Sequence, residues 1–550
     1  MPALESTSAP NADEPGTSAG LNQATIYLAE ATVTAFDDLI RAPDESEEPA
    51  FHVVHLAAAS GLDGRLYIQR REAAPPGWVE PLKSIAGRAL PPIEVQQAGA
   101  VLLVRLSGRI FAFAFGQGRY LLNHDLLVDD FGLRAAANMV DPERVRSVDG
   151  RTFVRGVLLT RHQASRPGRV EALGVQVDRE MFRAITGRSR RAGEGRVHGA
   201  TSLGLTRDMP FGALDQLGRE LLASYSATDY QASFSSLDRM RPLPRDSREV
   251  LRLNEALLDD LRSPDISAFL APPKILDWAH VSGFRLGRQP RGSINDDLDV
   301  KAYLSSIEDP QDLTFELLGH DEIRVLDRDS PRTIARWSVL QSLVWETTLG
   351  GQAYVLSEGR WYRIEQSYLE WVDAQVAKIP APSFTLPAPS SPDLVEEAYN
   401  REAARSMGAV LLDKKLARVN TKERGGFELC DLYLPPRNLI HVKRGLGSQE
   451  LTYLFEQGVQ AAEGYRNARE VRERLRNLVE SANPAAAADL PVDDRPQRDT
   501  FQVVYAVIAG TPQRVPRTLP FFARAALARA VRTLDELDFR CAALGIDLRP

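Results

Sequence analysis

Three polar residues in the last third of the chain have the types and spacing that suit metal-assisted phosphodiester hydrolysis. Asp431 lies in one stretch of strand character, and His441 and Lys443 lie in the next. Mg²⁺ takes one or two protein carboxylates together with substrate phosphate and water, and it lowers the pKa of the bound water. A lysine ammonium stabilises the charge that builds up on the phosphate oxygens. These residues therefore predict a magnesium site, which Mn²⁺ can also occupy, for hydrolysis of nucleic acid.

The elements that must position these side chains are expected in the order helix, strand, hairpin, helix. Their expected ranges are 393–407, 409–412, 427–434 with 439–444, and 448 onward. Gly408 is a typical helix end and Ser448 a good helix start. Glu397 or Glu402 on the first helix is expected to complete the metal shell. The predicted catalytic group is thus Asp431, His441, Lys443, Glu397 and Glu402, with Asp431, His441 and Glu402 as metal ligands.

The register of the hairpin decides whether these side chains meet. His441 and Lys443 share one face, because side chains alternate along a strand. A loop of three residues, or a bulge, is expected to set Asp431 opposite Lys443, whereas a four-residue loop turns Asp431 to the wrong face. A charged hairpin face without a catalytic role remains the alternative. Arg444 at the end of the hairpin, and Gln457 and Arg466 after it, are candidates for contacts with nucleic acid; capping a polar patch is the alternative for Gln457, and a solvated helix face for Arg466.

The segment from Asp431 to Lys443 resembles the motif of the restriction-endonuclease-like nuclease core in order and spacing. That motif has an acid on its second strand and acid-x-Lys on its third, and the resemblance implies a C-terminal αβββαβ core. The chain departs from it at His441, where the family usually has Asp or Glu. A neutral imidazole can ligate a metal or act as a general base, but it is a poorer Mg²⁺ ligand than a carboxylate. Either a helix acid supplies the missing ligand or the site is degenerate.

A second resemblance covers roughly residues 25–546. It rests on segments at 111–119, 131–134 with Asn138, 358–362, 399–400, 430–432, 440–444, 451–458 and 519–522. In that order they resemble a large family of bacterial proteins named for its sporadic distribution, which lies among mobile elements and phage-defence genes. The resemblance implies a bacterial cytoplasmic protein with a role in defence. It also implies that His441 is the usual residue of the family at its position.

Composition limits the function classes. The chain has 550 residues, 43% hydrophobic and 26% charged, so several folded domains are expected. The formal net charge of −7 argues against a surface that binds nucleic acid everywhere, although a local basic groove remains compatible. Two cysteines exclude a disulfide framework and a four-thiolate zinc site. No apolar run approaches the roughly 18 residues that span a bilayer, so a cytoplasmic protein is expected.

The chain is expected to be a multidomain protein of mixed α/β (α+β) class. The predicted parts are a disordered leader (1–23), a mixed α/β domain (24–187), an α+β domain (200–379), a proline-rich linker (380–392) and a nuclease-like domain (393–550). Five prolines and three serines make the linker extended. In the first domain, residues 100–104 and 109–115 around Ser107-Gly108 predict a hairpin.

Three functions remain in competition. The leading hypothesis is a Mg²⁺-dependent nuclease that acts on DNA in defence against phage or mobile elements. The main alternative is a nucleic-acid-binding or scaffold protein that keeps the nuclease-like fold without catalysis, and a third is a protein-interaction sensor. The expected partners are nucleic acid and either a second copy of the chain or a defence-system protein, with no membrane partner.

Overall fold

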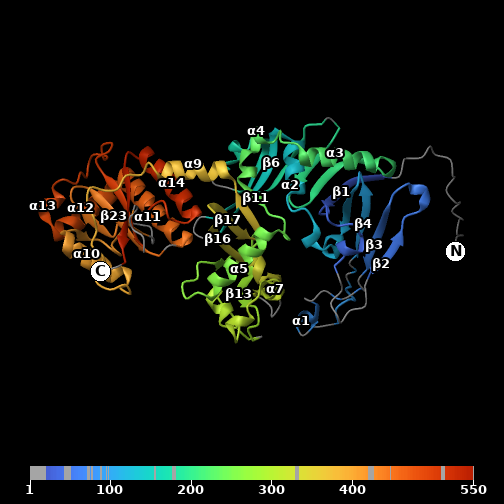
Figure 1. Cartoon of the computed structure of the whole chain (residues 1–550), viewed down its shortest axis with the longest axis horizontal. Helices are drawn as coiled ribbons and strands as arrows, with labels where there is room; N and C mark the ends of the chain where they lie inside the picture. The colour runs from blue at the N-terminus through green and yellow to red at the C-terminus, as the bar shows by residue number, and fades with distance from the viewer. Residues whose placement is uncertain are drawn as a thin grey trace. The chain divides into compact units, whose positions relative to one another are not determined.

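The structure is a computed structural model. It describes residues 20–41, 51–70, 73, 75, 79–83, 85–86, 89–94, 96, 98–153, 157–175, 181–191, 193–290, 292–328, 333–418, 426–445, 447–509 and 515–548. Most of the expected leader (1–23) lies outside these residues. Contacts divide the chain into two compact units, residues 1–151 with 160–237, and 152–159 with 238–550 (Figure 1). The first unit therefore continues to Leu237, past the boundary expected near residue 187.

The first unit is built on one ten-stranded sheet, antiparallel from β2 to β6. Its order is β2 (Phe51–His55), β3 (Gly64–Arg70), β4 (Ala98–Leu106), β5 (Arg109–Gly116), β1 (Gly20–Leu28), β10 (Leu203–Pro210), β9 (Arg196–Gly199), β8 (Met181–Ser189), β6 (Val140–Thr152) and β7 (Leu158–Gly168). The predicted hairpin is confirmed as β4 and β5. Ser107 and Gly108 both have positive φ, which suits a two-residue turn between twisted strands.

Helices of the first unit are α1 (Val79–Lys83), α2 (Phe131–Met139), α3 (Leu214–Ser226) and α4 (Gln231–Phe234). Both long helices bury one apolar face: α2 buries Phe131 and Ala135, and α3 buries Leu217 and Leu221. These side chains join those of β1, β4 and β5 in one hydrophobic core.

The first half of the second unit contains two antiparallel sheets. One has the order β11 (Met240–Pro242), β18 (Arg360–Ile364), β17 (Gln352–Ser357), β16 (Leu343–Leu349) and β12 (Phe269–Leu270), and the other β13 (Val281–Leu286), β14 (Glu322–Asp327) and β15 (Thr333–Ser338). Its helices are α5 (Arg248–Arg262), α6 (Val300–Leu304), α7 (Phe315–His320), α8 (Val339–Ser342) and α9 (Gln366–Val376). In α5, buried Val250, Leu253, Leu257 and Leu261 recur at helical spacing, and the Ser247 side chain caps the first turn.

The second half of this unit holds a mixed five-stranded sheet, in orange and red in Figure 1. Its order is β19 (Val410–Leu411), β22 (Leu432–Leu434), β23 (Asn438–Arg444), β24 (Gln502–Ala509) and β25 (Arg540–Asp547). The pairings are antiparallel from β19 to β23 and parallel from β23 to β25. A two-stranded ladder, β20 (Leu416–Ala417) with β21 (Phe427–Glu428), accompanies it.

Helices cover both faces of this sheet because its central strands are apolar on both sides. Strand β24 is buried from Val503 to Ala509, as expected for a parallel strand between helix layers. On one face, core residues of α11 (Ser448–Asn467), α12 (Arg469–Ala482), α13 (Pro484–Ala487) and α14 (Phe521–Glu536) pack with Leu439 and Tyr505. On the other, α10 (Glu396–Met407) packs with Ile440 and Val442. As the sequence predicts, Gly408 ends α10 in the left-handed conformation.

The proline-rich segment 380–392 contains no helix or strand, as its composition predicts. It is nevertheless packed onto the C-terminal sheet and its helix. Leu386 is buried, the Tyr399 hydroxyl donates to the Pro387 carbonyl at 2.9 Å, and the Ala543 N–H donates to the Pro380 carbonyl at 3.1 Å. The segment is therefore a strap that belongs to the C-terminal fold rather than a free spacer between domains.

Candidate functional site

The hairpin that carries the predicted site pairs β22 with β23 around Pro435, Pro436 and Arg437, with Leu434 opposite Asn438. The ladder continues with Leu432 opposite Ile440. Asp431 directly precedes this pair, and its N–H donates to the Ile440 carbonyl, so its backbone lies beside Ile440 and not beside Lys443. The expectation that a three-residue loop brings Asp431 opposite Lys443 is therefore wrong. In an antiparallel pair, a step of one residue back along the first strand corresponds to a step of one residue forward along the second, so the pair Leu434–Asn438 does not lead to Asp431–Lys443.

Asp431 is fixed by backbone contacts on both sides. Its N–H donates to the Ile440 carbonyl at 3.0 Å, and its carboxylate accepts from the Val442 N–H at 2.7 Å. Its carbonyl accepts from the N–H groups of Leu412 at 2.8 Å and Asp413 at 3.1 Å. Leu412 and Asp413, which follow β19, are thereby held beside Asp431, which precedes β22. This brings a second carboxylate, that of Asp413, next to Asp431.

Three carboxylates converge at this point: Asp413, Glu428 at the end of β21, and Asp431. Each offers an oxygen, and these oxygens lie within 4.8 Å of one another. We call these three residues the acid cluster. Carboxylate oxygens from three different strands or strand ends form the set of hard ligands that Mg²⁺, Mn²⁺ or Ca²⁺ accepts.

The electrostatics of the acid cluster favour either a proton or a cation. Burial, together with the charges of the nearby Asp413, Glu396 and Glu428 carboxylates, raises the pKa of Asp431 to about 8, against the opposing hydrogen bond from the Val442 N–H. Burial also raises the pKa of Glu428, and the charge of Asp413 adds to this effect. Like charges held this close cannot all ionise without compensation. A divalent cation would supply that compensation.

Two amide side chains border the acid cluster. Asn400 on α10 is fully buried, and its Nδ2 lies 3.5 Å from a carboxylate oxygen of Asp413. Its Oδ1 is buried and has no hydrogen-bond partner among the described residues. Gln457 on α11 places its Nε2 3.5 Å from the Glu428 carboxylate. A buried amide oxygen without a partner beside three acids is a costly arrangement that a bound cation or its water would relieve.

Lys443 is held by Glu396, an acid of α10 that the sequence-based hypothesis did not select. Its Nζ lies 3.2 Å from Glu396 on α10, and the same carboxylate accepts from the Arg444 N–H at 3.2 Å. Lys443 and Glu396 are both partly exposed, at 27% and 33% of their side chains, so water reaches the pair. Glu396 therefore links the two groups: it pairs with the Lys443 ammonium, and its charge acts on both Asp431 and Glu428.

His441 is buried in the sheet, 1% exposed, and burial lowers its pKa to about 4. Its ring centre lies 6.1 Å from that of Tyr505, and its Nε2 has no partner among the described residues. The imidazole is therefore neutral at physiological pH. It is not among the three residues whose ligand atoms converge.

The structure does not bring the predicted helix acids to Asp431. Glu397 is paired with Arg401 and with Lys414, the latter at 2.5 Å. Glu402 accepts from the Ser390 hydroxyl at 2.8 Å and thereby fastens the strap to α10. Glu397 and Glu402 are thus engaged elsewhere, and Asp413 and Glu428 stand where they were expected.

Two of the three residues predicted to contact nucleic acid are also engaged elsewhere. The Arg444 guanidinium donates to the carbonyls of Leu394, at 2.6 Å, and Pro392, so it pins the strap. Arg466 binds the Leu537 carbonyl at 2.9 Å and the Asp538 carboxylate, near the far end of α11. Of the three candidates, Gln457 is the one that reaches the acid cluster.

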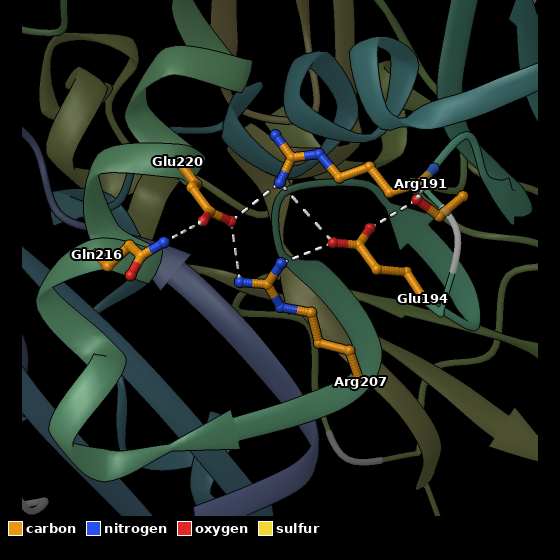
Figure 2. Close-up of polar contacts among 6 residues, drawn as sticks. Arg191, Glu194, Arg207, Gln216 and Glu220 are labelled. Carbon is orange, nitrogen blue, oxygen red and sulfur yellow. Dashed lines mark hydrogen bonds and ion pairs between the residues drawn. The ribbon is translucent and has the colours of Figure 1, made fainter.

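Arg191 and Arg207 of the first unit belong to a network of ion pairs with Glu194 and Glu220. The Arg207 guanidinium lies 2.6 Å from Glu194 and 3.0 Å from Glu220, and Arg191 lies 2.9 Å from Glu220 (Figure 2). Gln216 donates to Glu220 at 3.2 Å. The network joins β10, α3 and the loop between β8 and β9, which favours a structural role over phosphate binding.

Truncating Arg207 should cost more stability than truncating Arg191, although both contact the same acids. The Arg207 side chain is 18% exposed and its loss leaves Glu194, 10% exposed, without its closest cation. We expect Arg207→Ala to lower the local free energy of unfolding by about 2–3 kcal/mol, and Arg191→Ala, 52% exposed, by roughly 1 kcal/mol or less. Hydrogen exchange of the β10 and α3 amides measures this; equal losses would contradict the assignment.

Comparison with known proteins gives one match. Residues 24–547 match a family of unknown function, DUF6119. The chain belongs to this family. No curated protein and no solved structure matches it. Among the described residues of this DUF6119 protein, no helix combines the length and apolar character that crossing a membrane requires.

Proposed function

We propose that this DUF6119 protein is a divalent-metal-dependent nuclease that hydrolyses phosphodiester bonds of nucleic acid, DNA in the first instance. The observation that carries the proposal is the convergence of the Asp413, Glu428 and Asp431 carboxylates within 4.8 Å, with Lys443 held nearby by Glu396. Metal-assisted hydrolysis requires carboxylates that bind the metal ion and a positively charged side chain that faces the phosphate.

The proposed roles follow from the contacts. Asp413, Glu428 and Asp431 hold Mg²⁺ or Mn²⁺, which when bound polarises the phosphate and lowers the pKa of its water. The Lys443 ammonium stabilises charge on the phosphate oxygens, and Glu396 orients that ammonium. Asn400 and Gln457 orient the carboxylates of Asp413 and Glu428. His441, Glu397 and Glu402 have no ligand role in this proposal, which differs in that respect from the sequence-based hypothesis.

The element order supports a restriction-endonuclease-like core as part of the proposal. Helix α10, strands β19, β22 and β23, helix α11 and strand β24 come in the order αβββαβ, with β24 parallel to β23; the β20–β21 ladder and helices α12 and α13 are inserted between them. Asp431 precedes the second of these strands and Lys443 lies on the third. The sequence resemblance to a family found among phage-defence genes makes invading nucleic acid the proposed target.

Cleavage of supercoiled plasmid in Mg²⁺ tests the proposal. Lys443→Ala should lower the nicking rate roughly a hundredfold, because it removes the cation that stabilises transition-state charge. Lys378→Ala is the matched control, since Lys378 is exposed and its ammonium contacts the Gln375 side chain. A Lys443→Ala protein that nicks as fast as the control would remove the catalytic assignment.

Two observations favour the non-catalytic alternative: the ammonium of Lys443 is already paired with Glu396, and His441 is buried where an acid would serve catalysis. A nucleic-acid-binding or scaffold protein with this fold would bind DNA with an affinity that falls steeply with salt. It would show no metal-dependent nicking at any salt concentration.

A further inference from the structure

A cavity of about 750 Å³ lies within the second unit, at the carboxyl ends of β23 and β24. Arg444 and Ala509 line it from these strands, Ser448 from the start of α11, and Phe522 from the start of α14. Residues 264–269 and β16 form the facing wall. The carboxyl ends of parallel strands are where open α/β sheets bind ligands, and the volume falls in the usual range of ligand pockets, about 300–1,000 Å³.

The walls of the cavity combine aromatic surface with backbone donors. Phe153 and Phe522, which stack with ring centres 4.4 Å apart, and Trp345 supply the aromatic surface. The long helix α11 opens at Gly447 without a side-chain cap. Gly445, also in the lining, has a φ of 113°, which glycine adopts readily. Aromatic walls suit a planar base, and uncapped N–H groups at a helix start suit a phosphate oxygen.

The cavity adjoins the proposed catalytic site along the same strand. Arg444, in its lining, directly follows Lys443, and the Glu396 carboxylate contacts the Lys443 ammonium and the Arg444 N–H together. From Lys443 to Gly445 the strand advances by roughly 6.6 Å. This is close to the spacing of successive phosphates in a nucleic-acid strand, so a phosphate at the Lys443 ammonium would have its neighbour at the cavity.

We propose that the cavity takes one nucleotide of a single-stranded nucleic acid, the residue adjoining the phosphate at the Lys443 ammonium. The position of that phosphate rests on the proposed function; the nucleotide chemistry of the cavity rests on its own lining. A base inside a duplex reaches such a cavity only by leaving the stack, so single strands are preferred over duplexes.

The charges of the lining define how the nucleotide is held. Lys301 and Arg444 are basic, whereas Asp265, Glu346 and Glu450 are acidic. The Glu346 carboxylate accepts from the Phe522 N–H at 3.0 Å and so serves the start of α14. With the two signs nearly balanced, enclosure and stacking supply the affinity rather than phosphate attraction. The contribution of the cavity should therefore change little with salt, unlike that of a basic groove.

Binding of labelled decanucleotides to the full chain tests the inference. Asp431→Asn protein is used in EDTA, so that neither metal nor cleavage enters the measurement. Gln449→Trp fills the cavity from an exposed position in the first turn of α11, and Gln497→Trp is the matched control, exposed and placed before the opposite end of β24. Equal melting temperatures of the two variants verify the fold. Fluorescence anisotropy is recorded with a single strand, a blunt duplex and a competing mononucleotide, at low and high salt.

We expect Gln449→Trp to weaken single-strand binding about tenfold or more at both salt concentrations, and Gln497→Trp to leave it unchanged. A duplex that binds as tightly as the single strand, or equal affinities of the two tryptophan variants, would overturn the inference. A mononucleotide that binds as tightly as the decanucleotide would overturn the proposal that the cavity takes part of a nucleic-acid strand, and would assign the cavity to free nucleotides. The two proposals can fail separately. If the wild type does not nick DNA but Gln449→Trp still weakens single-strand binding, the proposed function fails and the cavity assignment holds. If the wild type nicks DNA but the two tryptophan variants bind equally, the cavity assignment fails and the proposed function holds.

Discussion

Asp431→Asn should lower metal-dependent nicking roughly a hundredfold or more and, in metal-free buffer, raise the stability of the folded chain at pH 8. The loss of activity follows because asparagine removes one of three carboxylates from the cation site, and weaker perturbations around metal ligands already cost about 10–100-fold. The gain in stability follows because the amide still offers an oxygen to the Val442 N–H without a buried charge. Activity and stability therefore change in opposite directions.

The sign of the pH dependence can be derived from the pKa of Asp431, which is about 8 in the folded chain and about 3.9 when unfolded. Between these values the folded state holds a proton that the unfolded state has released. The stabilisation from this proton is complete below about pH 4 and is lost as the pH rises through 8. Thermal denaturation of the wild type in EDTA should show this decline.

Asp431→Asn should flatten this decline, and at pH 8 its free energy of unfolding should exceed that of the wild type by about 2 kcal/mol or more. Asp489→Asn, at an exposed aspartate, is the control and should follow the wild-type curve. A wild-type curve parallel to that of Asp431→Asn would show that Asp431 is ionised in the folded protein without metal. The electrostatic argument for a cation at the acid cluster would then fail.

Local signals in the sequence identified local structure well. The turn residues Ser107 and Gly108 predicted the β4–β5 hairpin, and Gly408 predicted the end of α10, because each effect depends on the conformational preference of a few neighbouring residues. The expected first helix, first strand, return strand and last helix correspond to α10, β19, β23 and α11, whereas the expected strand 427–434 divides into β21, which pairs with β20, and β22, which pairs with β23. Mixed α and β structure in several sheets is confirmed.

The composition of the site depends on pairings that local signals do not determine. Asp413 reaches Asp431 because β19 pairs with β22, and Glu428 reaches both because β21 pairs with β20. Glu396 lies within the expected helix 393–407 and Asp413 directly follows the expected strand 409–412, yet the sequence-based hypothesis selected Glu397 and Glu402. Neighbours on a helix differ by about 100° in direction, so one residue decides which acid faces the sheet.

Addition of Mg²⁺, Mn²⁺ or Ca²⁺ should raise the melting temperature of the wild type, and Glu428→Gln should abolish this rise while Glu402→Gln preserves it. A cation at about 100 times its dissociation constant stabilises the folded state by about 2.7 kcal/mol. Glu428 contributes an oxygen to the acid cluster, whereas Glu402 binds Ser390 on the strap. The two substitutions make the same chemical change, so the comparison isolates position.

The rise should also weaken as the pH falls, because protons compete with the cation for Asp431 and Glu428, whose pKa values are raised. Differential scanning fluorimetry at several pH values and metal concentrations measures both effects. If Glu402→Gln abolished the shift and Glu428→Gln kept it, the cation would belong on the strap-facing side of α10. The convergence of three strand-borne carboxylates would then be a structural acid cluster that holds a proton, and the hydrolytic proposal would lose its metal.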